Sequence, residues 1–141
     1  MTRPFDRPTR NIYPGVFCAA VILLLTGLPG SFLPKQKPVI GLDKIAHLLM
    51  YLCLAFLSLW GYRKPYRENG KRYRHKAIII TAAIGLAYGA LTEIMQETLI
   101  PGRVGSIYDW AADAMGTLLG LAFFHFFNQN RNKLKNAALH K

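Results

Sequence analysis

Four long runs of apolar residues, separated by shorter polar segments, divide the chain. The runs cover residues 15–33, 42–62, 77–100 and 107–127. About 20 apolar residues cross the hydrocarbon core of a bilayer, so each run is long enough to span a membrane as a helix. Pro29 and Gly30 interrupt the first run, and Pro101 with Gly102 ends the third. The pattern predicts an all-α integral membrane protein, a four-transmembrane-helix bundle within one domain over residues 15–127.

The basic residues are distributed unevenly between the two ends of this predicted bundle. The N-terminal segment 1–14 holds 3 Lys or Arg, the loop expected over 63–76 holds 7, and the basic tail 128–141, expected to be partly disordered, holds 4, which together make 14 of the 18. Positively charged loops stay in the cytoplasm. We therefore expect both termini to be cytoplasmic, in a bacterial cytoplasmic (inner) membrane.

Composition agrees with a membrane protein and removes other classes. Apolar residues make up 52% of the chain, charged residues 18%, and the mean hydropathy is +0.17. The net charge of +11 is explained by basic segments facing anionic lipid head groups, without nucleic acid as a partner. Cys18 and Cys53 lie in apolar runs and form no CxxC pair, so we interpret them as buried apolar residues. A cleaved signal peptide is the competing interpretation of the first run, although it lacks a good A-x-A site.

Polar residues gather near the opposite end of the runs. Asp43, His47 and Tyr51 recur at i, i+4 and i+8 on one helix face. Ionisable groups inside a membrane are costly and are functional candidates by default. At about 1.5 Å per residue, three predicted helices place such groups at similar depth, so we expect one outward-facing cavity. Its expected residues are Asp43, His47, Tyr51, Glu93, Gln96, Arg103, Asp109 and Asp113.

Blander interpretations remain open for some residues near this end. Asp43 could be only a helix cap, and His47 a core histidine with a single hydrogen bond. Glu97 could be a solvated acid, and Arg103 a cation of a surface loop. Lys44 could extend to the membrane interface without a specific partner.

Small residues are spaced for helix contact. Gly85 and Gly89 form a GxxxG pattern in the third run, and Gly116 and Gly120 form another in the fourth. This spacing lets helix backbones approach closely. We expect these four glycines to lie at helix–helix contacts.

Together the motif residues resemble a known family over residues 42–121. The matching pattern is Asp43-Lys44-x-x-His47-x-x-x-Tyr51, Glu93-x-x-Gln96, Arg103, and Asp109-x-x-x-Asp113-x-x-Gly116 with Gly120. It is similar to that of the VanZ-like membrane proteins. The resemblance implies a small bacterial envelope protein, and the founding member is associated with resistance to the glycopeptide teicoplanin. Many relatives have Asn where this chain has Asp113, which puts a fixed charge there in doubt.

Three functional hypotheses follow. In the first, the cavity binds a lipid head group, a cell-wall precursor or a glycopeptide-related ligand, with Arg103 pairing to phosphate or carboxylate. In the second, the protein is an intramembrane enzyme that modifies such a head group, with His47 as general base or with the carboxylates and His47 holding a divalent metal. No HExxH motif and no nucleophile motif supports a more specific reaction. The third, a proton-coupled carrier, is weakened by the lack of an internal repeat.

Overall fold

Every regular element of the described chain is a helix. A computed structural model describes residues 11–29, 31 and 42–139, with side chains placed through residue 130. The helices are α1 (Tyr13–Thr26), α2 (Leu42–Gly61), α3 (Arg63–Glu68), α4 (Gly70–Leu99) and α5 (Ile107–Leu139). The predicted all-α fold is confirmed.

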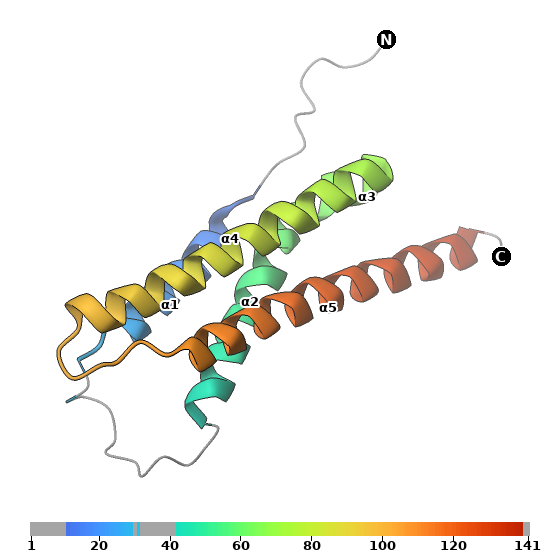
Figure 1. Cartoon of the computed structure of the whole chain (residues 1–141). Coiled ribbons are helices and arrows are strands. Elements are labelled where there is room, and N and C mark those ends of the chain that lie inside the picture. The colour runs from blue at the N-terminus through green and yellow to red at the C-terminus, as the bar shows by residue number, and fades with distance from the viewer. Residues whose placement is uncertain (1–10, 30, 32–41, 140–141) are drawn as a thin grey trace.

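The long helices run alternately up and down the bundle (Figure 1). Helix α2 makes its most extensive contact with α5, α1 packs on α2, and α4 packs on α5. One end of the bundle carries the short α3. The other carries the connection between α4 and α5 over residues 100–106, and we call these the α3 end and the α4–α5 end (Figure 1).

Three of the helices have the length and composition of membrane spans. They are α2 with 20 residues, α4 with 30, and the first 24 residues of α5, Ile107–Asn130. Many large apolar side chains remain exposed on them, including Ile84, Leu91 and Phe123, which suits a surface that faces lipid. The protein is therefore a membrane protein. Helix α1, with 14 residues, is about 21 Å long, shorter than a hydrocarbon core of about 30 Å.

Three expectations for element boundaries were wrong. The helix expected over 15–33 ends at Thr26, because Gly27 closes its last turn and the residue before Pro29 disfavours helix. The polar segment 63–76 is not a loop, since α3 and the first turns of α4 occupy it. Lys and Arg are good helix formers, and Gly70, with φ of 76°, provides the sharp link between the two helices.

The third wrong boundary is the C-terminal end of the fourth helix. Helix α5 continues without interruption to Leu139, through a segment that contains no Gly or Pro after residue 127. The backbone of residues 128–139 is therefore helical, and the fourth helix extends beyond its expected end at residue 127.

An aromatic core fixes the α3 end. Tyr66 of α3 packs edge-on against Phe124 of α5, with ring centroids 5.2 Å apart, and its hydroxyl lies 2.8 Å from Nδ1 of His125. Burial raises the pKa of the Tyr66 phenol, so the hydroxyl keeps its proton and can donate to the imidazole. Leu59 and Leu121 complete the same cluster. This core holds α2, α3 and α5 together at the end opposite the polar residues.

Glycines mark the closest approaches between helices. A Cβ built on Gly116 would lie 2.2 Å from the Leu48 carbonyl oxygen of α2, and one on Gly120 would lie 2.4 Å from that of Leu52. Gly85 meets the Thr117 side chain of α5 in the same way, at 2.7 Å. These contacts set how closely α5 approaches both α2 and α4, and so how the polar residues on the three helices meet.

Candidate functional site

The buried trio of His47, Glu93 and Asp113 lies where α2, α4 and α5 meet. Nδ1 of His47 is 2.9 Å from Oδ1 of Asp113 and 3.7 Å from Oε1 of Glu93. The exposed fractions of the residues are 2% for His47, 7% for Glu93 and 0% for Asp113. Three ionisable groups from three helices thus share a space from which solvent is excluded.

Close helix packing makes room for the trio. Gly89 of α4 faces Asp113 of α5, and a Cβ there would lie 3.1 Å from Oδ2 and 3.2 Å from Cβ of the aspartate. Because Gly89 has no side chain, the Asp113 carboxylate fits between the two helices. Thr117 follows Asp113 one turn later on the same face of α5 and is also fully buried.

Acceptors outnumber donors in the trio. Within the described part of the chain, Oε1 of Glu93 and Oδ2 of Asp113 are buried and have no hydrogen-bond partner. One imidazole nitrogen, Nδ1 of His47, faces both carboxylates and can donate at most one hydrogen bond. An unsatisfied buried carboxylate oxygen is costly, and more so in a membrane. The trio is therefore a site that favours a proton, a hydrogen-bond donor or a cation.

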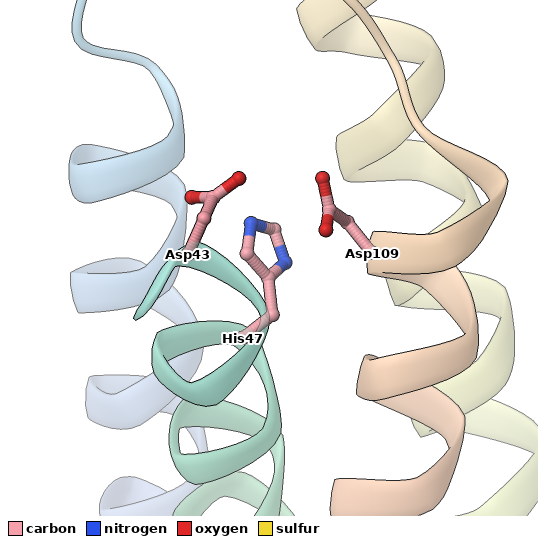
Figure 2. Close-up of side chains that lie close together, drawn as sticks. All are labelled: Asp43, His47 and Asp109. Carbon is pink, nitrogen blue, oxygen red and sulfur yellow. The ribbon is translucent and has the colours of Figure 1, made fainter. Parts of the chain in front are cut away.

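A second group of charges adjoins the trio toward the α4–α5 end. The His47 imidazole lies between the carboxylates of Asp43 and Asp109, with one ring nitrogen directed toward the gap between them (Figure 2). Nζ of Lys44 forms an ion pair with Oδ1 of Asp109 at 3.0 Å. Asp43 is exposed, whereas Asp109 is buried. By distance, both Asp43–His47–Asp109 and the buried trio can hold a metal ion, since the ligand atoms within each set lie within 4.8 Å of one another.

The loop between α4 and α5 is bound by two acids of α4. The Ser106 amide donates to Oε2 of Glu93, and the Gly105 amide donates to Oε2 of Glu97, each at 2.7 Å. Ser106 in turn caps α5, since its hydroxyl accepts the Asp109 amide at 3.4 Å. Carboxylates are favoured at the positive end of a helix dipole. Sequence reasoning missed this role of Ser106, although Ser106-x-x-Asp109 before an apolar run is a capping signal.

A cavity of about 640 Å³ opens beside this loop. Glu93 and Glu97 supply its charged groups, the amides of Gly105 and Ser106 lie on one side, and Trp110 forms part of its apolar wall. Glu93 thus connects the cavity with the buried trio.

Two of the expected cavity residues have partners elsewhere. The Gln96 amide donates to the Thr26 carbonyl at 3.3 Å. Thr26 ends α1, where carbonyls have no partner within the helix, so buried Gln96 fastens α1 to α4. The Tyr51 hydroxyl lies 3.0 Å from Oγ1 of Thr92, one helical turn below His47. Neither residue lines the cavity beside the loop.

Arg103 also differs from its expected place. Its side chain is half-buried, it does not line the cavity, and among the described residues no acid lies within ion-pair distance of it. Glu93 and Glu97 accept backbone amides of the loop that carries Arg103. Among the described residues, Lys44 forms the ion pair of this end of the bundle, with Asp109.

Comparison with known proteins agrees with the motif residues. The VanZ/LLP1 family matches residues 8–128, which includes α1, α2, α3, α4 and the first two thirds of α5. None of the curated proteins and none of the solved structures compared with the chain matches it. The match covers most of the sequence and every residue of the buried trio, so the chain belongs to the VanZ/LLP1 family.

Proposed function

We propose that this protein is a bacterial cytoplasmic-membrane protein of the cell envelope that binds the polar head of a lipid-linked molecule. The binding place is the cavity at the α4–α5 end. The observation that carries the proposal is Oε1 of Glu93, a buried oxygen without a hydrogen-bond partner on a side chain that lines an open cavity. A ligand that donates to the Glu93 carboxylate gains a charge-assisted hydrogen bond.

The lining defines the chemistry of the ligand. Glu93 and Glu97 are acidic, and among the described residues no Lys or Arg lines the cavity. The part of the ligand that enters is therefore a hydrogen-bond donor, such as a hydroxyl, amide or ammonium group. The apolar side chains of Ile94, Ile107 and Trp110 suit the first carbons of a lipid tail.

Charge distribution supports an outward-facing cavity. The α3 end carries 7 Lys or Arg over residues 63–76, and such segments stay in the cytoplasm. The α4–α5 end then faces the outer surface, where cell-wall precursors and glycopeptide ligands are met. Membrane lipids with suitable head groups are the other candidate partners.

Native mass spectrometry of the purified protein tests the proposal. The probes are short-chain phosphatidylethanolamine, short-chain phosphatidylglycerol and a lipid-linked peptidoglycan precursor. We expect retention of at least one probe that carries amide or ammonium groups, and loss of that retention in Glu93→Gln. Glu68→Gln, at an exposed acid of the α3 end, serves as the matched control. Equal retention by parent and Glu93→Gln would exclude the cavity as the binding place.

An enzyme acting on the same head group is the second candidate. It is favoured by the contact of 2.9 Å between Nδ1 of His47 and Oδ1 of Asp113, because a carboxylate that orients an imidazole is the usual arrangement of a general base. Incubation of the purified protein with the same precursor, carrying a radiolabel in its head group, distinguishes the two functions. Product formation that Asp113→Asn abolishes would establish catalysis, and unchanged precursor after prolonged incubation would exclude it.

A further inference from the structure

We propose that the buried trio binds one divalent transition-metal ion. The ion would be held by Nδ1 of His47, Oε1 of Glu93 and the carboxylate of Asp113. This inference does not require the proposed head-group binding, because metal binding can be measured without lipid ligand.

The distances within the trio fit a single ion. Ligands about 2.1 Å from one metal are separated by about 3.0 Å in octahedral and about 3.4 Å in tetrahedral geometry. Nδ1 of His47 lies 2.9 Å from Oδ1 of Asp113 and 3.7 Å from Oε1 of Glu93. The ligand atoms of Glu93 and Asp113 also lie within 4.8 Å of each other. A shift of about 0.3 Å brings the His47–Glu93 distance to the tetrahedral value, and three helices already hold the side chains.

The unpaired oxygens give an independent reason for a cation. Oε1 of Glu93 and Oδ2 of Asp113 are both buried without a hydrogen-bond partner in the described chain, and each belongs to a side chain more than nine-tenths buried. A bound metal would coordinate Glu93 through the unpaired atom. Its other oxygen, Oε2, would keep the Ser106 amide, which fixes the carboxylate orientation as second-shell hydrogen bonds do in metal sites.

Charge balance favours a divalent ion over a proton. With His47 neutral, the two ionised carboxylates leave the trio with a charge of −2. Protonation of the imidazole removes only half of this charge, and a net charge within a membrane is costly. One divalent ion brings the sum to zero when Nδ1 of His47 binds it and the imidazole, still neutral, carries its proton on Nε2.

The neighbouring set of Asp43, His47 and Asp109 is a weaker candidate. Lys44 already neutralises Asp109, with Nζ at 3.0 Å from Oδ1, and Asp43 is exposed, so water satisfies its carboxylate. In the described part of the chain, no Lys or Arg forms an ion pair with Glu93 or Asp113. The two sets share His47, so they are alternative sites for one ion. Substitutions of Asp43 and of Glu93 therefore distinguish them.

The donor set indicates the class of metal. One imidazole nitrogen and two carboxylates suit Zn²⁺, Mn²⁺ or Fe²⁺, whereas Mg²⁺ and Ca²⁺ prefer oxygen ligands alone. Glu93 also lines the cavity of about 640 Å³, so movement of this side chain would admit an ion to the trio. Three protein ligands leave a coordination position on that side, where a head-group oxygen could bind.

Metal content of the purified protein tests the proposal. The chain is purified without a polyhistidine tag, in a background in which the other three histidines, His75, His125 and His140, are replaced by Gln. The protein is stripped with a chelator, equilibrated with Zn²⁺ or Co²⁺, desalted and assayed by elemental analysis. We expect one ion per chain and a raised melting temperature with Zn²⁺ but not with Mg²⁺.

Variants locate the ion. Glu93→Gln and Asp113→Asn should each weaken Zn²⁺ binding by at least about tenfold, whereas Glu97→Gln and Asp43→Asn should remain within about twofold of the background protein. Circular dichroism and elution volume establish that each variant is folded. If a trio variant fails to fold, the d–d spectrum of Co²⁺ in the background protein still tests for nitrogen and oxygen ligands without thiolate.

Three outcomes would overturn the proposal. They are less than about 0.1 ion per chain at saturating Zn²⁺, binding that Glu93→Gln and Asp113→Asn leave unchanged, or binding lost equally in Asp43→Asn. Retained Zn²⁺ binding without retention of any lipid probe would refute head-group binding alone, so the two proposals can fail separately.

Discussion

Replacing Gly116 by alanine directly tests how α2 and α5 hold the site. The new Cβ would lie 2.2 Å from the carbonyl oxygen of Leu48, 3.0 Å from its carbonyl carbon and 3.1 Å from its Cα. All three atoms belong to the backbone, so no side-chain rotation relieves the overlap. The two helices must separate, and α2–α5 is the most extensive helix contact in the bundle.

The size of the effect follows from this separation. An ordinary carbon–oxygen contact requires the backbones to move apart by about 1 Å, and a gap of that size removes roughly a quarter to a half of the dispersion energy between facing atoms. Overpacked interiors usually lose about 1–3 kcal/mol. The backbone clash places this substitution in the upper part of that range, and alanine favours a helix over glycine by roughly 1 kcal/mol. We therefore expect Gly116→Ala to lower the free energy of unfolding by a net amount of about 1–2 kcal/mol.

Unfolding by sodium dodecyl sulfate in mixed micelles, followed by circular dichroism, measures the change. Gly85→Ala is the matched control, because its Cβ would instead meet the Thr117 side chain at 2.7 Å. Combining it with Thr117→Ala should restore most of the lost stability, whereas Leu48→Ala should not rescue Gly116→Ala. A Gly116→Ala protein as stable as the parent, or rescued by Leu48→Ala, would refute the backbone contact as the cause.

Three further predictions concern topology and single contacts. Reporter fusions at the C-terminus and within residues 67–72 should both report cytoplasm, and a periplasmic signal from either would reverse the proposed orientation of the cavity. Tyr66→Phe should lower the free energy of unfolding by about 1 kcal/mol in the same assay, because His125 loses its hydroxyl partner. An unchanged free energy of unfolding would mean that this contact does not stabilise the protein. Gln96→Leu should lower the free energy of unfolding by a similar amount, because it leaves the Thr26 carbonyl unpaired, and it should leave Zn²⁺ binding unchanged. A loss of bound Zn²⁺ in this variant would mean that Gln96 belongs to the metal site.

Local patterns in the sequence carry the large-scale features of this protein. The apolar runs predict membrane helices because lipid cannot satisfy exposed backbone groups, and α2, α4 and α5 have the required length. The motif residues of those helices predict the family, which the match over residues 8–128 confirms. Boundaries were less accurate. The basic segment 63–76 was predicted to be a loop, yet α4 begins within it, at Gly70. Lys and Arg favour helix as well as solvent.

Shared helix faces are also a local property. A period of 3.6 residues is enough to place Asp109 and Asp113 on one stripe of α5, and His47 on the polar stripe of α2. The stripes say that polar side chains turn away from lipid. They do not say which atoms meet, because that depends on the axial position and rotation of one helix against another.

The tertiary structure therefore decided the partners. Lys44 rather than Arg103 pairs with Asp109, since the register of α2 against α5 brings that ammonium group within 3.0 Å. Gln96 faces the end of α1 rather than the cavity, because α1 stops at Thr26. Hydrogen bonds and metal ligands require positions accurate to a few tenths of an ångström, and only the close glycine contacts between the helices set positions that finely.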